Sequence, residues 1–84
     1  MFLHVESVSH IENYRLRIKF NDGAIKEVDL GEELRGDIFE PLKKMDSFSK
    51  VYISPDTHTI EWPNGADFAP EFLYEIGVDL KKSA

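Results

Sequence analysis

The sequence contains no cysteine, which excludes disulfide bonds, thiolate nucleophiles and zinc sites built on cysteine. It also lacks any apolar run close to the ~18 residues that a membrane-spanning helix needs, so no membrane association is expected. The start of the chain has neither the basic region nor the apolar stretch of a signal peptide. These absences together predict a cytoplasmic protein.

Basic residues are also few, because 10 Lys and Arg stand against 16 Asp and Glu and give a net charge of −6. An acidic surface repels phosphate backbones, so direct nucleic-acid binding is not expected. The same charge favours encounter with a basic protein partner. It would equally serve solubility alone, and the composition leaves both interpretations open.

The length of 84 residues predicts one domain, over residues 1–78, followed by a frayed C-terminal tail at 79–84. Ordering such a chain costs about 1.5 kcal/mol per residue. Most of the large apolar side chains must therefore fill one core. Few remain to line a deep ligand cavity, so no cofactor is expected.

Strict alternation of apolar and cationic residues from Tyr14 to Phe20 predicts a half-buried antiparallel strand. The turn sequence 21–23 then predicts a tight reversal, and residues 24–30 return as the partner strand. Carboxylates of the returning strand would lie on the same outer face as the cations. We therefore expect cross-strand ion pairs there, and not a binding patch, among Arg15, Arg17, Lys19, Glu27 and Asp29.

Further elements follow from local patterns. Strands are predicted at 3–10, 50–54 and 58–62, and a short helical turn within 31–36. One helix is expected from an Asp37 N-cap, with Glu40 completing a capping box, to about residues 46–47. A second begins near Pro70 and ends at Gly77 in a left-handed conformation. The order β-β-β-α-β-β-α predicts a small α+β domain with two short helices; the strand order within the sheet stays open.

No arrangement of residues typical of catalysis is present. The three histidines, His4, His10 and His58, lack the spacing of metal ligands. The sequence has no Gly-x-Ser-x-Gly nucleophile motif and no phosphate-binding P-loop. The carboxylates Asp67 and Glu71 lie at a helix start, where they would complement the helix dipole. We therefore expect no metal, no catalytic residue and no enzymatic activity.

Residues 62–74 hold the only tryptophan, two of the four prolines, a turn dipeptide and a helix start. We refer to them as the signature segment. The segment reads Trp-Pro-Asn-Gly-Ala-Asp, followed by Pro-Glu-Phe-Leu-Tyr. Together with the strand at 14–20, its Asn-Asp-Gly turn and the Val-Asp-Leu at 28–30, it resembles the bacterial domain-of-unknown-function family 2442. The resemblance covers about Val5 to Tyr74.

The resemblance implies an α+β fold and a small prokaryotic protein, and it supplies no catalytic residues. It also implies pairing with proteins of family 4160 in toxin–antitoxin-like gene pairs. Other members carry a helix-turn-helix domain after this module. This chain is expected to have no room for one.

Two functional hypotheses follow. The first is a non-enzymatic protein-binding module, the acidic, antitoxin-like partner of a small basic protein. The alternative is an oligomerising or sensing module linked to transcription regulation, with a homodimer as one form. For Trp62, a purely structural place in the core is the competing interpretation. The candidate interface or signature residues are Trp62, Asn64, Gly65, Asp67, Phe68, Glu71 and Tyr74.

Overall fold

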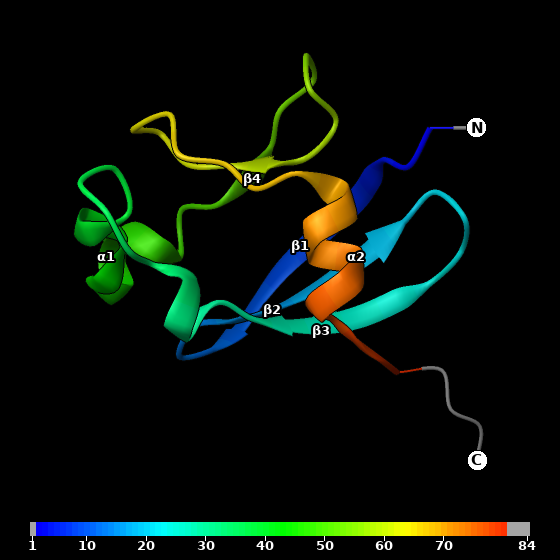
Figure 1. Cartoon of the computed structure of the whole chain (residues 1–84), viewed down its shortest axis with the longest axis horizontal. Coiled ribbons are helices and arrows are strands. Elements are labelled where there is room, and N and C mark those ends of the chain that lie inside the picture. Colours follow the sequence, from blue (N-terminus) through cyan, green and yellow to red (C-terminus); the bar gives the residue numbers. More distant parts are fainter. Residues whose placement is uncertain (1, 81–84) are drawn as a thin grey trace.

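The computed structural model describes residues 2–80. Its elements, in chain order, are β1 (Val5–Glu12), β2 (Arg15–Phe20), β3 (Ile25–Asp29), the 3-10 turns η1 (Gly31–Glu33) and η2 (Glu40–Lys43), α1 (Met45–Phe48), β4 (Tyr52–Ile53), β5 (Ile60–Glu61), α2 (Pro70–Ile76) and β6 (Val78–Asp79). Strands β1, β2, β3 and β6 form one antiparallel sheet in that order, and β4 and β5 form a separate hairpin. This is the predicted α+β domain, with β6 as an added strand (Figure 1). Within residues 2–80, no helix combines the length and the apolar character that a membrane crossing requires.

Strand β2 forms as its alternation predicts, because Leu16, Ile18 and Phe20 all point into the core and are 0% exposed. The cations between them point to the opposite face. There the guanidinium of Arg17 lies 3.1 Å from a carboxylate oxygen of Glu27, its partner on β3. The predicted cross-strand ion pairs are confirmed for Arg17 and for Arg15, whose Nε lies 3.9 Å from an oxygen of Asp29. Lys19 instead lies opposite Ile25.

One face of the sheet carries the core, and the other faces solvent. Helix α2 packs on β3 over the inner face, where Leu73 is fully buried (Figure 1). The hairpin β4–β5 and helix α1 complete the cover through the buried side chains of Ile60, Trp62 and Phe48. These residues come from distant parts of the chain, so one contiguous core holds the sheet, the hairpin and both helices together.

The helix expected from Asp37 is broken into two pieces. The carbonyl of Gly36 accepts the N–H groups of Phe39 and Glu40, which places Asp37 inside a turn. The predicted Asp37 N-cap and capping box are therefore wrong, because η2 begins after Phe39 without a side-chain cap. The extended backbone of Lys44 (φ −82°, ψ 129°) separates η2 from α1, which ends at Phe48.

The end of α2 also differs from the expectation. Gly77 has φ −72° and ψ 152°, so its predicted left-handed conformation is wrong, and the chain runs straight into β6. A Cβ at this position would lie 3.0 Å from the carbonyl oxygen of Leu73 and from carbons of the Lys26 side chain, so close approach explains the glycine. The expected tail begins with Asp79 inside β6, and Leu80 donates its N–H to Ile25. Residues 81–84 lie outside the described part of the chain.

Candidate protein-interaction surface

Trp62 opens the signature segment from the centre of the core. Its side chain is 0% exposed, and its indole N–H donates to the carbonyl of Phe48 over 2.8 Å. The ring lies against the rings of Phe48 and Phe68, with centroid distances of 5.6 and 6.1 Å. These contacts join the hairpin to α1. Because the side chain is buried, Trp62 serves the core and is not exposed to a partner.

The turn after Trp62 is closed by its own hydrogen bonds. Gly65 has φ +92°, a conformation that favours glycine, and its N–H donates to the Trp62 carbonyl over 2.8 Å. The side-chain oxygen of Asn64 accepts the Ala66 N–H at 3.1 Å, and its amide donates to the Ile38 carbonyl at 2.8 Å. Asn64 and Gly65 thus fix the turn and tie it to the loop before η2.

Three half-buried phenylalanines stack beside this turn. The ring of Phe68 lies 4.8 Å from that of Phe39 and 5.6 Å from that of Phe72, and both pairs are nearly parallel. The hydroxyl of Thr59 holds the backbone here by donating to the Phe68 carbonyl over 2.6 Å. We refer to Phe39, Phe68 and Phe72 as the aromatic row. Of these three, only Phe68 is a candidate interface residue from the sequence. Phe72 follows four residues later, a spacing that could have indicated a contact with Phe68, whereas Phe39 is distant in the chain and only the fold places it here.

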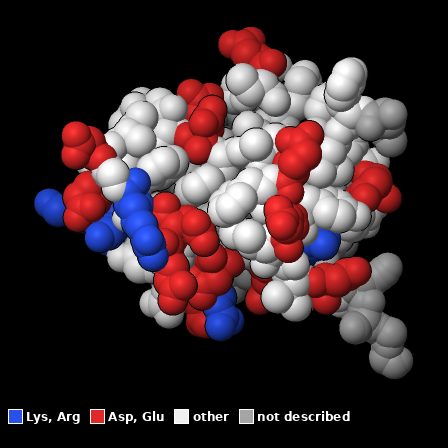
Figure 2. Space-filling model, viewed as in Figure 1, with Lys and Arg blue, Asp and Glu red and all other residues white. Residues whose placement is uncertain are grey.

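Three exposed carboxylates accompany the aromatic row in the chain: Asp67 precedes Phe68, Glu71 precedes Phe72, and Glu75 follows one helical turn later. We refer to Asp67, Glu71 and Glu75 as the acidic surface. Among residues 2–80, no Lys or Arg forms an ion pair with any of them. Figure 2 shows carboxylates over α2 with little positive charge beside them. Glu71 lies in the first turn of α2, where its carboxylate complements the helix dipole, whereas Asp67 lies outside the helix. Glu75, four residues further on, repels Glu71 at a cost of about 0.2–0.5 kcal/mol, so its charge does not serve helix stability.

Tyr74 connects α2 to the turn between β2 and β3. Its hydroxyl donates to Asp22 over 2.7 Å, and the other oxygen of Asp22 accepts the Ala24 N–H at 2.9 Å. The hydrogen bonds from Ala24 and then Tyr74 lower the pKa of Asp22. The hydrogen bond to Asp22, together with burial, raises the pKa of Tyr74. Lys26 donates to the Tyr74 carbonyl at 3.0 Å and lies 4.1 Å from the centre of the tyrosine ring.

Replacing Tyr74 by phenylalanine should therefore reveal a pH-dependent contribution to stability. A lowered carboxyl pKa stabilises the fold above the unfolded-state value, and this is lost as the pH falls through the folded pKa of Asp22. A raised phenol pKa stabilises below the unfolded-state value, and this is lost as the pH rises through the folded pKa of Tyr74.

We expect Tyr74→Phe to lower the Tm at neutral pH, and the deficit to shrink in both acid and strong alkali. Thermal melts followed by circular dichroism across the pH range measure this. Tyr14→Phe is the control for loss of a phenol, since the Tyr14 hydroxyl donates to the backbone carbonyl of Lys43, which does not titrate, so its deficit should not shrink in acid. A Tyr74→Phe deficit of constant size at all pH values would show that the hydrogen bond to Asp22 does not contribute.

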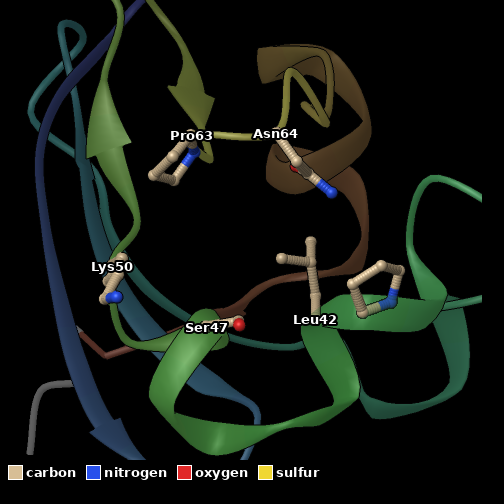
Figure 3. Close-up of a pocket in the computed structure, with 6 residues that line it drawn as sticks. Leu42, Ser47, Lys50, Pro63 and Asn64 are labelled. Carbon is tan, nitrogen blue, oxygen red and sulfur yellow. The ribbon is translucent and has the colours of Figure 1, made fainter.

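A small hollow lies beside Pro63 and Asn64, in the turn after Trp62 (Figure 3). Leu42 points into it from η2, and Pro63 and Asn64 close the opposite side. Its volume is about 160 Å³, which is below the ~300 Å³ of typical small-molecule sites. The hollow is large enough for about one apolar side chain. Its lining residues are Pro41, Leu42, Ser47, Lys50, Pro63 and Asn64.

The histidines take part in local contacts. The rings of His4 and His58 stack at 4.3 Å, and His10 Nε2 lies 2.7 Å from the Asn13 carbonyl oxygen. In the part of the chain from residue 2 to 80, no three His, Asp or Glu side chains converge in a way that could hold a metal ion. Asp67 and Glu71 of the acidic surface thus each precede a ring of the aromatic row in the chain. The buried Trp62 and the turn closed by Asn64 and Gly65 hold this segment in place.

Comparison with known proteins places this geometry in a family. The chain resembles the crystal structure of a protein from Nitrosomonas europaea ATCC 19718 described as a putative DNA-binding protein, with 28% sequence identity and a TM-score of 0.79. The match covers 89% of this chain and 48% of that one, so the chain spans about half the length of that protein. No curated protein matches it. The family model for proteins of unknown function DUF2442 matches residues 5–79, and the chain belongs to this family.

Proposed function

We propose that this domain is a non-enzymatic, cytoplasmic protein-binding module that holds a small basic protein, as an antitoxin-like partner would. The observation that carries the proposal is that, within residues 2–80, Glu71 and Glu75 form no ion pair with Lys or Arg and lie on the same short helix as Phe72, one ring of the half-buried aromatic row. The net charge of −6 adds long-range attraction toward a basic partner and speeds its encounter.

The contacts favour arginine as the partner residue. A guanidinium can bind a carboxylate such as Glu71 in bidentate fashion and stack on an aromatic face such as Phe72. An exposed ion pair alone contributes about 0.2–1 kcal/mol, so carboxylates by themselves would give weak binding. Burial of the aromatic row under the partner would add the apolar area and exclude water from the ion pairs. The 160 Å³ hollow beside Pro63 could take one apolar side chain of the same partner.

The proposal assigns no reaction and no cofactor to the chain. The pKa values of Asp22, Tyr52 and Tyr74 are displaced from the ordinary ones. The first and last of these share the hydrogen bond that fastens α2 to the sheet. Burial and the neighbouring Glu61 raise the pKa of Tyr52. Each shift is accounted for by a contact that supports the fold.

The double variant Glu71→Gln with Glu75→Gln tests the proposal. We expect a tagged wild-type chain, expressed in its host at native level, to co-purify with one basic protein at equal stoichiometry by mass spectrometry. The double variant should weaken binding to that protein by about tenfold or more, which corresponds to roughly 1.4 kcal/mol. Isothermal titration calorimetry with the isolated partner gives the affinity.

The matched control is Glu32→Gln with Asp56→Asn. It also removes two negative charges, one from η1 and one from the turn between β4 and β5. It should keep nearly wild-type affinity at physiological salt. Equal weakening by both pairs would show that only net charge matters and that α2 is not the contact. Absence of any protein partner would contradict the proposal altogether.

The resemblance to a putative DNA-binding protein supports a second candidate function. We propose as the alternative that the domain oligomerises or senses a signal within a transcription-linked system, while another polypeptide region contacts DNA. The match to only 48% of that chain agrees with a division of labour between regions. Salt-sensitive binding of duplex DNA by this domain alone, measured by fluorescence anisotropy, would contradict that division.

A further inference from the structure

The solvent face of the sheet, opposite α2, differs in charge from the rest of the molecule. We refer to the exposed side chains of β2, β3, β6 and Leu80 on this side as the outer face. Its charged residues are three cations and two carboxylates, namely Arg15, Arg17, Lys19, Glu27 and Asp29, and Glu12 of the neighbouring β1 adds a third carboxylate that pairs with Arg15. A chain with a net charge of −6 thus has one nearly neutral face. Two copies can approach each other there with the least electrostatic repulsion.

The same face carries exposed apolar side chains at one corner. Val78 is 67% exposed, and Ile25 and Leu80 are each 38% exposed. They are neighbours, because Val78 pairs with Glu27 next to Ile25, and the Leu80 N–H donates to the Ile25 carbonyl. Contiguous exposed apolar residues of this kind mark sites of association more often than scattered ones do.

The corner has both an exposed side chain and recesses. Val78 is 67% exposed and lines one of two open hollows of the sheet. One, of about 490 Å³, is lined by Arg17, Gly23, Ile25 and Leu80. The other, of about 230 Å³, is lined by Arg15, Glu27, Asp29, Ile76 and Val78. A two-fold dimer needs a projection and a recess on the same surface, so that each copy fills the other. The outer face offers both.

We propose that the outer face binds a second copy of this chain, sheet against sheet around a two-fold axis, with Val78 of each copy entering the hollow beside Ile25 of the other. The ion pairs Arg15–Asp29 and Arg17–Glu27 then border the apolar contact as a polar rim. In this dimer the two acidic surfaces remain free on the outside, because α2 covers the opposite side of the sheet. Each dimer would present two identical sites for a basic partner.

Sedimentation equilibrium over a range of concentrations tests the dimer with three variants. Wild type should show a reversible equilibrium between 9.7 kDa and twice that mass. Val78→Glu should raise the dimer Kd at least tenfold, because it places a carboxylate in the partner's hollow. Ile38→Glu is the matched control, since Ile38 is 46% exposed but lies in the loop before η2. It should leave the Kd unchanged.

The third variant, Glu71→Gln with Glu75→Gln, separates this contact from the acidic surface and should also dimerise like wild type. A wild type that stays monomeric at about 1 mM would overturn the proposal. So would assembly that grows beyond the dimer and disappears with the two glutamine substitutions, because the outer face would then bind α2 of the next copy head to tail. Circular dichroism of every variant confirms that the fold is retained before its mass is compared.

Discussion

Replacing Trp62 by alanine is expected to lower the free energy of unfolding by about 3–5 kcal/mol, the usual cost of removing a large buried aromatic side chain. The side chain is fully buried and lies between α1 and the aromatic row, so its loss opens a cavity at the junction of three elements. A domain of this length has a total stability of roughly 4–13 kcal/mol. Trp62→Ala should therefore leave the fold marginal or unfolded at 37 °C.

Urea denaturation followed by far-ultraviolet circular dichroism measures this effect, because the variant loses the only tryptophan fluorophore. Trp62→Phe is the matched control, since it keeps an aromatic ring but removes the N–H that donates to Phe48. Its cost should be smaller, about 1–3 kcal/mol, the penalty for an unsatisfied buried carbonyl and a partial cavity. A Trp62→Ala variant within 1 kcal/mol of wild type would refute the central structural place of this residue.

The second large effect is expected from Leu73→Ala, which removes the only fully buried side chain of α2. Truncation of a buried leucine costs about 2–5 kcal/mol. Helix α2 has only 7 residues, well below the ~12–15 residues at which isolated helices become even marginally stable. The helix is therefore held by docking, and we expect α2 to unfold locally in this variant while β2 stays ordered.

Native-state hydrogen exchange distinguishes local from global loss. The amides of Leu73 and Gly77, which donate within the helix and at its end, should exchange much faster in the variant. The amides of β2 should keep most of their protection. Glu75→Ala controls for substitution on the exposed side of the same helix and should stay within about 0.5 kcal/mol of wild type. Equal loss of protection in β2 and α2 would show that the helix is not a separate unit.

These two variants also bear on function. The acidic surface depends on α2, so Leu73→Ala should impair partner binding without touching a carboxylate. The glutamine variants change the carboxylates and leave the helix in place. If Leu73→Ala and the glutamine variants weaken partner binding to the same extent, binding needs both the carboxylates and an ordered α2, as the proposed surface requires.

Local sequence patterns were sufficient for β2, the turn after it and its pairing with β3. The alternation in β2 has a period of two residues, and a one-residue shift would bury three cations, so the inward face of the strand is fixed by the sequence. The turn at 21–23 then sets the register with β3, which brings Arg17 opposite Glu27. The signature segment is likewise built from local hydrogen bonds. Its turn and its Pro70 helix start depend on neighbouring residues in the chain.

What only the tertiary structure decided depends on residues far apart in the chain. Strand β6 forms because α2 delivers Val78 alongside β3, and Gly77 is a glycine because Lys26 lies against it. The failure of the cap predicted at Asp37 is an exception with a local cause, because the Gly36 carbonyl closes a turn around that residue. Phe39 lies against Phe68 across 29 positions of sequence, and the hydrogen bond from Asn64 to the Ile38 carbonyl ties the same two loops together. Sequence periodicity reports which side of an element is buried, whereas a surface assembled from several elements exists only once the core has brought them together.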